Sequence, residues 1–147
     1  MTKAKIKLYA KHRIKLERIT KKRYNTYEVI YVSDSILRDK AKRFAKDIVF
    51  LCREIKTNYK ESVLVNQLLR SGTSIGANNH EAQYAQSTND FISKFEIAQK
   101  ECYETEYWLE LLFEVGCISE DKYKLIQNNC EAIRRMLISS LKTIKSK

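Results

Sequence analysis

The sequence contains no proline and only three glycines among its 147 residues. Proline breaks helices and glycine marks turns, so their scarcity favours long uninterrupted helices over a turn-rich β fold. No apolar run approaches the roughly 18–20 residues that a membrane span needs, and the chain does not open on the pattern of a secretory signal. We therefore expect a soluble, cytoplasmic protein with one folded helical domain and no membrane partner.

The four cysteines form no Cys-x-x-Cys pair, the spacing typical of zinc and redox sites. Three of them fall on apolar helical stripes, where a reduced cysteine behaves as a small core residue. A di-metal bundle needs paired Glu-x-x-His motifs, and this chain offers only Glu101-x-x-Glu104 and His80-Glu81. The sequence predicts neither a metal site nor a disulfide.

Motifs for nucleophilic catalysis and phosphate binding are also missing. The segment from Arg70 to Ser74 contains glycine and hydroxyl groups, but it lacks the residue order of a phosphate-binding loop and follows no strand. Ser71 and Ser74 have no histidine partner nearby in sequence, and spatial proximity of His80 alone would not make a catalytic triad. We expect a protein that is not an enzyme and that holds no cofactor.

Positive charge is concentrated at the amino-terminal end. The net charge is +10, and residues 1–30 contribute +8 of it, with ten Lys or Arg against two Glu. A basic arm is typical of a nucleic-acid binder, although a solubilising tail or a start codon placed too far upstream would look the same. We interpret residues 1–33 as a basic, flexible arm and residues 34–147 as the folded domain. The arm and a cluster near the C-terminus supply the candidate nucleic-acid-binding residues Lys11, Arg13, Lys15, Arg18, Lys21, Lys22, Arg23, Arg134, Arg135, Lys142 and Lys145.

Four amphipathic segments follow the arm, which itself gains some β character from tyrosine and valine between residues 24 and 31. In each segment apolar residues recur at steps of three and four, the period of one buried helical face. We expect helices from about 34 to 57, from 62 to 84, from a Ser87 cap to a stop at Gly116, and from a Ser119 cap onward. Short connections make neighbours antiparallel, so the prediction is an all-α, up-down-up-down four-helix bundle.

The second predicted helix carries two unusual features. Gly72 and Gly76 each cost it roughly 1 kcal/mol relative to alanine, which a helix usually accepts where another backbone comes close. A polar row on this helix faces acidic residues of the third helix, and buried or interfacial charges need partners. We expect a structural polar network formed by Gln67, Arg70, Ser74, Asn78, Glu81, Glu101 and Glu104.

The third predicted helix is apolar over more than one stripe. Its inner stripe, from Phe91 to Leu112, suffices to fill a bundle core. Ile97, Trp108 and Leu111 lie off that stripe, where they would form an exposed apolar patch. We expect this patch to join identical subunits in a homo-oligomer.

Two long stretches of this chain resemble a known family. The first runs Gln-Leu-Leu-Arg-Ser-Gly-Thr-Ser-Ile-Gly-Ala-Asn over residues 67–78, followed by Glu81-Ala82. The second comprises Asp-Phe-Ile-Ser-Lys at 90–94 and Lys-Glu-Cys-Tyr-Glu-Thr-Glu-Tyr-Trp-Leu-Glu-Leu-Leu at 100–112. Both are similar to signatures of the four-helix-bundle family of 23S rRNA intervening-sequence proteins. The resemblance covers roughly residues 35–145, and the arm at 1–33 departs from it.

The resemblance implies a small bacterial protein that assembles as a homopentamer. It also implies kinship with the accessory proteins of diversity-generating retroelements, which bind nucleic acid and a reverse transcriptase. We therefore expect a non-enzymatic, homo-oligomeric protein that binds structured or rRNA-related RNA through basic surfaces. The alternative is a protein-interaction scaffold that docks a partner such as a reverse transcriptase.

Overall fold

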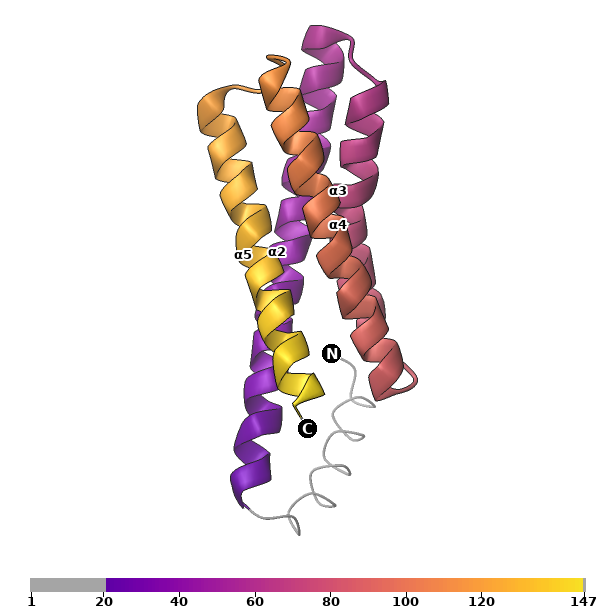
Figure 1. Cartoon of the computed structure of the whole chain (residues 1–147), viewed down its shortest axis with the longest axis vertical. Helices are drawn as coiled ribbons and strands as arrows, with labels where there is room; N and C mark the ends of the chain where they lie inside the picture. The colour runs from indigo at the N-terminus through magenta and orange to yellow at the C-terminus, as the bar shows by residue number, and fades with distance from the viewer. Residues whose placement is uncertain (1–20, 147) are drawn as a thin grey trace, which may run out of the picture. The chain divides into compact units, whose positions relative to one another are not determined.

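The computed structural model describes the backbone of residues 21–146 and the side chains of residues 35–146. Its helices are α2 (Lys21–Tyr59), α3 (Val63–Ala82), α4 (Thr88–Glu114) and α5 (Glu120–Lys145), shown in Figure 1. Successive helices run in opposite directions, and no strand occurs among the residues described. The predicted all-α, up-down-up-down four-helix bundle is confirmed.

The internal contacts divide the chain into two compact units, Met1–Asp34 and Ser35–Lys147. The second unit contains the bundle. The predicted binding residues Lys11, Arg13, Lys15 and Arg18 lie outside the described residues, and the flexible character predicted for that part of the arm stays a prediction.

The first helix begins earlier than the sequence predicted, at Lys21 instead of near residue 33. Residues 24–31, which we expected to have β character, are helical. No proline or glycine interrupts residues 21–59, so the helix continues through Ser33–Ser35. These residues would cap a helix that began after them, but here they lie in its interior. Lys21, Lys22 and Arg23 therefore belong to α2.

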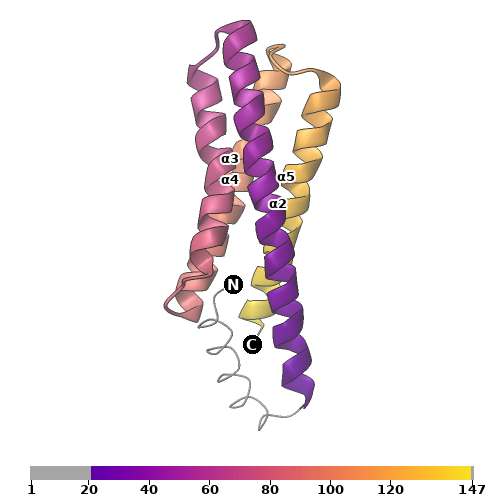
Figure 2. The same cartoon turned by 180° about the vertical axis from the view of Figure 1, so that it is seen from behind.

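Contacts between the helices define the order of the bundle. The Cys52 thiol of α2 donates to the Val65 carbonyl of α3 at 3.6 Å. α3 packs along α4, and α4 packs along α5. Lys122 of α5 donates to the Glu54 carboxylate of α2 at 2.6 Å, so the last helix of the bundle contacts the first. α2 and α4 therefore occupy opposite corners of the bundle, with α4 in front in Figure 1 and α2 in front in Figure 2.

The predicted apolar stripes form the core. Burial of these side chains removes apolar surface from water and is the main favourable term in folding. Cys52, Cys102 and Cys130 are buried, as their positions on the stripes predicted. Burial raises the pKa of the Cys52 thiol to about 11, so it stays protonated and unreactive at neutral pH. The largest fully buried side chains are Leu37, Phe44, Ile48, Ile55, Val65, Leu68, Ile75, Phe95, Leu109, Leu112, Ile133 and Leu137.

The ends of α4 follow the predicted capping chemistry. The Ser87 hydroxyl accepts from the Asp90 backbone N–H at 3.1 Å. At the other end, Gly116 takes a φ of 80°, and Cys117 N–H donates to the Leu112 carbonyl at 2.8 Å. This is a Schellman motif, which needs a left-handed residue that glycine adopts without a Cβ penalty.

The two helical glycines of α3 make different contacts. A Cβ at Gly72 would lie 2.9 Å from two side-chain carbons of the buried Ile48 on α2. A Cβ at Gly76 would lie 3.4 Å from the backbone oxygen of Ala41, an ordinary van der Waals contact. The expected close approach of a neighbouring backbone therefore occurs at Gly76, whereas at Gly72 a branched side chain fills the space.

Alanine substitutions at these glycines should have opposite effects. Gly72→Ala should destabilise the bundle by about 1–3 kcal/mol, because the new methyl group overlaps Ile48 in a packed core. Gly76→Ala should be neutral or stabilising by up to about 1 kcal/mol, because alanine is the better helix former. Urea unfolding followed by circular dichroism measures both. Equal destabilisation by the two substitutions would show that Ile48 does not limit the packing.

Candidate functional site

A polar cluster joins α3 to α4. Arg70 of α3 forms ion pairs with Glu101 and Glu104 of α4, the former at 3.4 Å from Nη1 to Oε1. The Trp108 indole N–H donates to the same Glu104 oxygen at 3.1 Å. The hydrogen bond from Arg70, and then that from Trp108, lower the pKa of Glu104. The cluster thus holds one carboxylate charged between two donors and fixes the register of the two helices.

The remaining residues of the predicted polar network lie elsewhere. Glu81 pairs with Lys94, a partner that the sequence pattern did not identify. The Asn78 amide donates to the Ser74 carbonyl at 2.9 Å within α3 itself. Gln67 is exposed. The structure therefore separates the predicted set into one cluster around Arg70 and two independent pairs.

Two polar features of the interior escaped the sequence reasoning. The Thr105 hydroxyl of α4 donates to the Ser71 hydroxyl of α3 at 3.0 Å, and both residues are buried. Asn79 is only 1% exposed, and its amide has no hydrogen-bond partner among the described residues. The predicted polar network contained the neighbouring Asn78 and not Asn79, a difference of one residue that periodicity does not resolve.

The predicted cationic cluster of α5 is largely neutralised. Arg134 pairs with Glu106 at 2.8 Å, lies 4.8 Å from the centre of the Tyr103 ring, and has only 19% of its side chain exposed. Glu106 raises the pKa of the Arg134 guanidinium. Arg135 pairs with Glu131 at 2.7 Å, and Lys145 pairs with Glu96. Lys142 is exposed and forms no ion pair with a described residue.

The cations without acidic partners gather instead on α2. We define the α2 cationic strip as the Lys and Arg residues between positions 38 and 46, which form no ion pair within residues 35–146. In contrast, every Lys and Arg of α3, α4 and α5 is ion-paired except Lys100 and Lys142. Two acids, Asp39 and Asp47, leave the strip with an excess of positive charge. The members of the strip are Arg38, Lys40, Lys42, Arg43 and Lys46.

An exposed aromatic ring extends this strip. Phe50 follows Lys46 by four residues, so it lies on the same helical face, and it is 62% exposed. The Arg53 guanidinium lies 6.0 Å from the centre of the ring. Cations interleaved with an accessible aromatic ring can bind phosphates and stack on bases. The sequence signal was the excess of Lys and Arg over residues 38–46, none of which was among the predicted nucleic-acid-binding residues.

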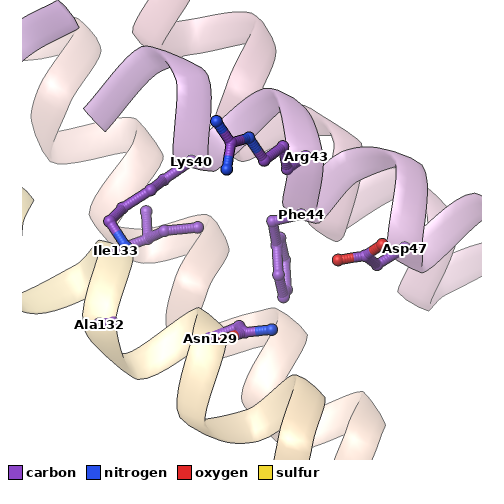
Figure 3. A pocket seen from close by; sticks show the side chains of 7 residues that line it. All are labelled: Lys40, Arg43, Phe44, Asp47, Asn129, Ala132 and Ile133. Carbon is purple, nitrogen blue, oxygen red and sulfur yellow. The ribbon is translucent and has the colours of Figure 1, made fainter. Parts of the chain in front are cut away.

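A groove runs between α2 and α5 beside the strip. Lys40, Arg43 and Asp47 line it from α2, and Asn129 and Ala132 line it from α5 (Figure 3). The buried side chains of Phe44 and Ile133 form its floor. Its volume is about 200 Å³.

The outer face of α4 is partly apolar. Ile97 is 38% exposed and Tyr107 is 56% exposed, whereas Trp108 and Leu111 are half-buried. The Tyr107 and Trp108 rings pack edge to face, with centroids 4.9 Å apart. The predicted interface residues Ile97, Trp108 and Leu111 thus lie on one side of α4, next to the Arg70 cluster.

These features define a class: a small all-α protein built as an antiparallel four-helix bundle. The family model of the 23S rRNA-intervening sequence protein matches residues 33–139, and the chain belongs to this family. The match confirms the resemblance carried by residues 67–112.

A solved structure shares this fold. It is the crystal structure of a protein of unknown function from the S23 ribosomal protein family of Bacteroides thetaiotaomicron VPI-5482. The two chains are 48% identical with a TM-score of 0.74, over 75% of this chain and 98% of that chain. No curated protein matches this chain.

Two absences bear on the class of site. No helix among the described residues has the length and apolar character to cross a membrane. Over the same part of the chain, no group of three or more His, Cys, Asp and Glu side chains converges as metal ligands would.

The Arg70 cluster should make the stability of the bundle depend on pH. The folded-state pKa of Glu104 is lowered, so its charge stabilises the fold above the unfolded-state pKa of roughly 4.3, and this contribution is lost as the pH falls through the folded-state pKa. Glu104→Gln should cost about 1 kcal/mol at neutral pH, and the difference from wild type should shrink in acid.

Urea unfolding over a pH series measures this effect. Glu110→Gln is the matched control, because Glu110 is an exposed carboxylate of the same helix without an ion pair to any described residue. A constant difference between Glu104→Gln and wild type at all pH values would contradict the assignment.

Proposed function

We propose that this protein binds RNA without catalysing a reaction, and that it does so as a homo-oligomer. The observation that carries the RNA-binding part is the α2 cationic strip, whose cations have no acidic partners within the described bundle. The name of the family, 23S rRNA-intervening sequence protein, supports an rRNA-related target. The exposed ring of Phe50 favours an RNA with unpaired bases, because single-stranded RNA stacks its bases on aromatic side chains.

The basic surfaces differ in whether their cations already have acidic partners. A cation already paired with a carboxylate gains less from a phosphate, because binding must first give up the existing pair. Arg134, Arg135 and Lys145 are in this position. The strip on α2 needs no such exchange, so we assign it the larger share of phosphate binding. Lys142, Lys21, Lys22 and Arg23 stay candidates for additional contacts.

Substitution of two strip lysines tests the RNA-binding proposal. Lys42→Gln with Lys46→Gln should weaken RNA binding and reduce the slope of log K against log salt by about 1 for each phosphate that the variant no longer neutralises. Filter binding with 23S rRNA fragments, and with DNA of the same sequence, over a salt series measures both quantities.

The matched control is Lys124→Gln with Arg135→Gln, which removes the same charge from paired, exposed positions of α5. The control should have a smaller effect. Equal reductions in affinity for both double variants would show that net charge alone drives binding. Absence of RNA binding by the wild type, with a protein partner that survives nuclease treatment in a pull-down, would favour the scaffold alternative.

The oligomeric part of the proposal is supported by the outer face of α4. Ile97, Tyr107, Trp108 and Leu111 give that face an apolar surface with aromatic character, which is enriched at the centres of protein interfaces. The Arg70 cluster borders it with fixed charges that can orient a second subunit. A ring of five subunits is the assembly that the family resemblance implies.

Substitution of Trp108 tests the interface. Trp108→Ala should cost on the order of 2 kcal/mol or more per interface, because a large aromatic anchor is removed, and the protein should dissociate to folded monomers or small oligomers. Light scattering coupled to size exclusion measures the mass, and circular dichroism checks the fold. Leu125→Ala, which truncates an exposed leucine of α5, is the control and should leave the mass unchanged. A monomeric wild type at about tens of micromolar would contradict the proposal.

A further inference from the structure

The groove between α2 and α5 combines an apolar floor with polar walls. Phe44 and Ile133 are almost fully buried and close it from below. Figure 3 shows the Asp47 carboxylate and the Asn129 amide beside the Phe44 ring, while Lys40 extends from α2 toward α5. The polar groups therefore surround an apolar floor, instead of meeting at a point as ligands of an ion do.

The size of the groove limits its occupant. Its volume of about 200 Å³ is below the roughly 300–1,000 Å³ of pockets that enclose whole drug-sized ligands. It therefore suits one planar ring system better than a complete cofactor. The groove is also continuous with the α2 cationic strip, because Lys40 and Arg43 belong to both.

The charges in the groove distinguish a base from a phosphate. A pocket for phosphate would be lined by donors alone, and the Asp47 carboxylate would repel an anion placed beside it. A carboxylate accepts hydrogen bonds from the amino group of a base, and an amide such as Asn129 both donates and accepts. Lys40 and Arg43 are free of ion pairs with the described residues and can hold the phosphates on either side.

We propose that this groove receives one unpaired base of a bound RNA strand, with Asp47 and Asn129 at its polar edge and Phe44 and Ile133 beneath it. The inference rests on the proposed function, since the flanking phosphates lie on the α2 cationic strip. The strip continues beyond the groove through Lys42 and Lys46, which offers more cations than the phosphate of one free nucleotide requires. A strand is therefore the occupant.

Three nucleic acids of equal length test the base-binding groove. They are a single-stranded RNA of mixed sequence, an abasic ribose-phosphate strand, and an RNA duplex. The wild type should bind the base-containing strand about tenfold more tightly than the abasic strand, because a bound base adds stacking and edge contacts. Adenosine monophosphate should compete only weakly.

Two pairs of variants locate the effect. Ala132→Leu fills the groove without changing charge, and it should remove the preference for the base-containing strand while leaving the affinity for the abasic strand unchanged. Ala77→Leu, at an exposed alanine of α3, is its control. Asn129→Ala should reduce the preference, whereas Asn128→Ala, which removes the same amide from an exposed position outside the groove lining, should not. Circular dichroism confirms that each variant is folded.

The outcomes separate this inference from the proposed function. Equal affinity of the wild type for the two single strands, with salt-dependent binding intact, would overturn the groove alone. A preference that survives Ala132→Leu, or competition by adenosine monophosphate at concentrations equal to the strand, would also overturn it. Failure to bind any of the three nucleic acids would overturn the proposed function and the groove together.

Discussion

The close packing of α3 against α2 fixes the orientation of α2 about its own axis. The Ile48 side chain occupies the space that a Cβ at position 72 would need, and Gly76 allows the Ala41 backbone to come within van der Waals contact. With Ile48 held in that space, the Lys42–Lys46 face has to point away from the core. A rotation of α2 that exposed Ile48 would bury cations without partners, which is far more costly than leaving them in water. Core packing therefore decides which charges are exposed to solvent.

The strip itself carries a cost for the free protein. Arg38, Lys42 and Lys46 follow one another at steps of four, and like charges at that spacing destabilise a helix by roughly 0.2–0.5 kcal/mol per pair. Elsewhere the bundle avoids this cost by pairing cations with acids of the same or a neighbouring helix, as Arg134 does with Glu106 and Arg135 with Glu131. A polyanion on α2 would relieve the repulsion, so part of the binding free energy would come from strain already present in the unbound helix.

The sequence predicted the bundle well because burial and helical period are the same physical signal. The stripe from Leu37 to Ile55 and the Ser87 and Gly116 ends of α4 follow from local rules. The start of α2 at Lys21 does not follow from these local rules. A favourable cap at residues 33–35 has no effect where the helix already continues before it. Local rules could not predict the ion pairs between helices. Glu106 and Arg134 lie 28 residues apart, and they meet because α4 and α5 are neighbours that pack in one particular register. The groove beside Phe44 likewise arises from two helices that are distant in sequence.

The bundle order places the two proposed surfaces on opposite sides. α4 packs between α3 and α5, while α2 contacts α3 and α5 from the other corner (Figures 1 and 2). Subunits joined through the outer face of α4 would therefore leave the α2 cationic strip uncovered on every copy. A single strip with one base-sized groove is a small contact, but several copies on one assembly raise the effective concentration of each site for a long RNA. The proposed oligomerisation through α4 and the proposed RNA binding through α2 are thus compatible, and the first would compensate for the small contact area of the second.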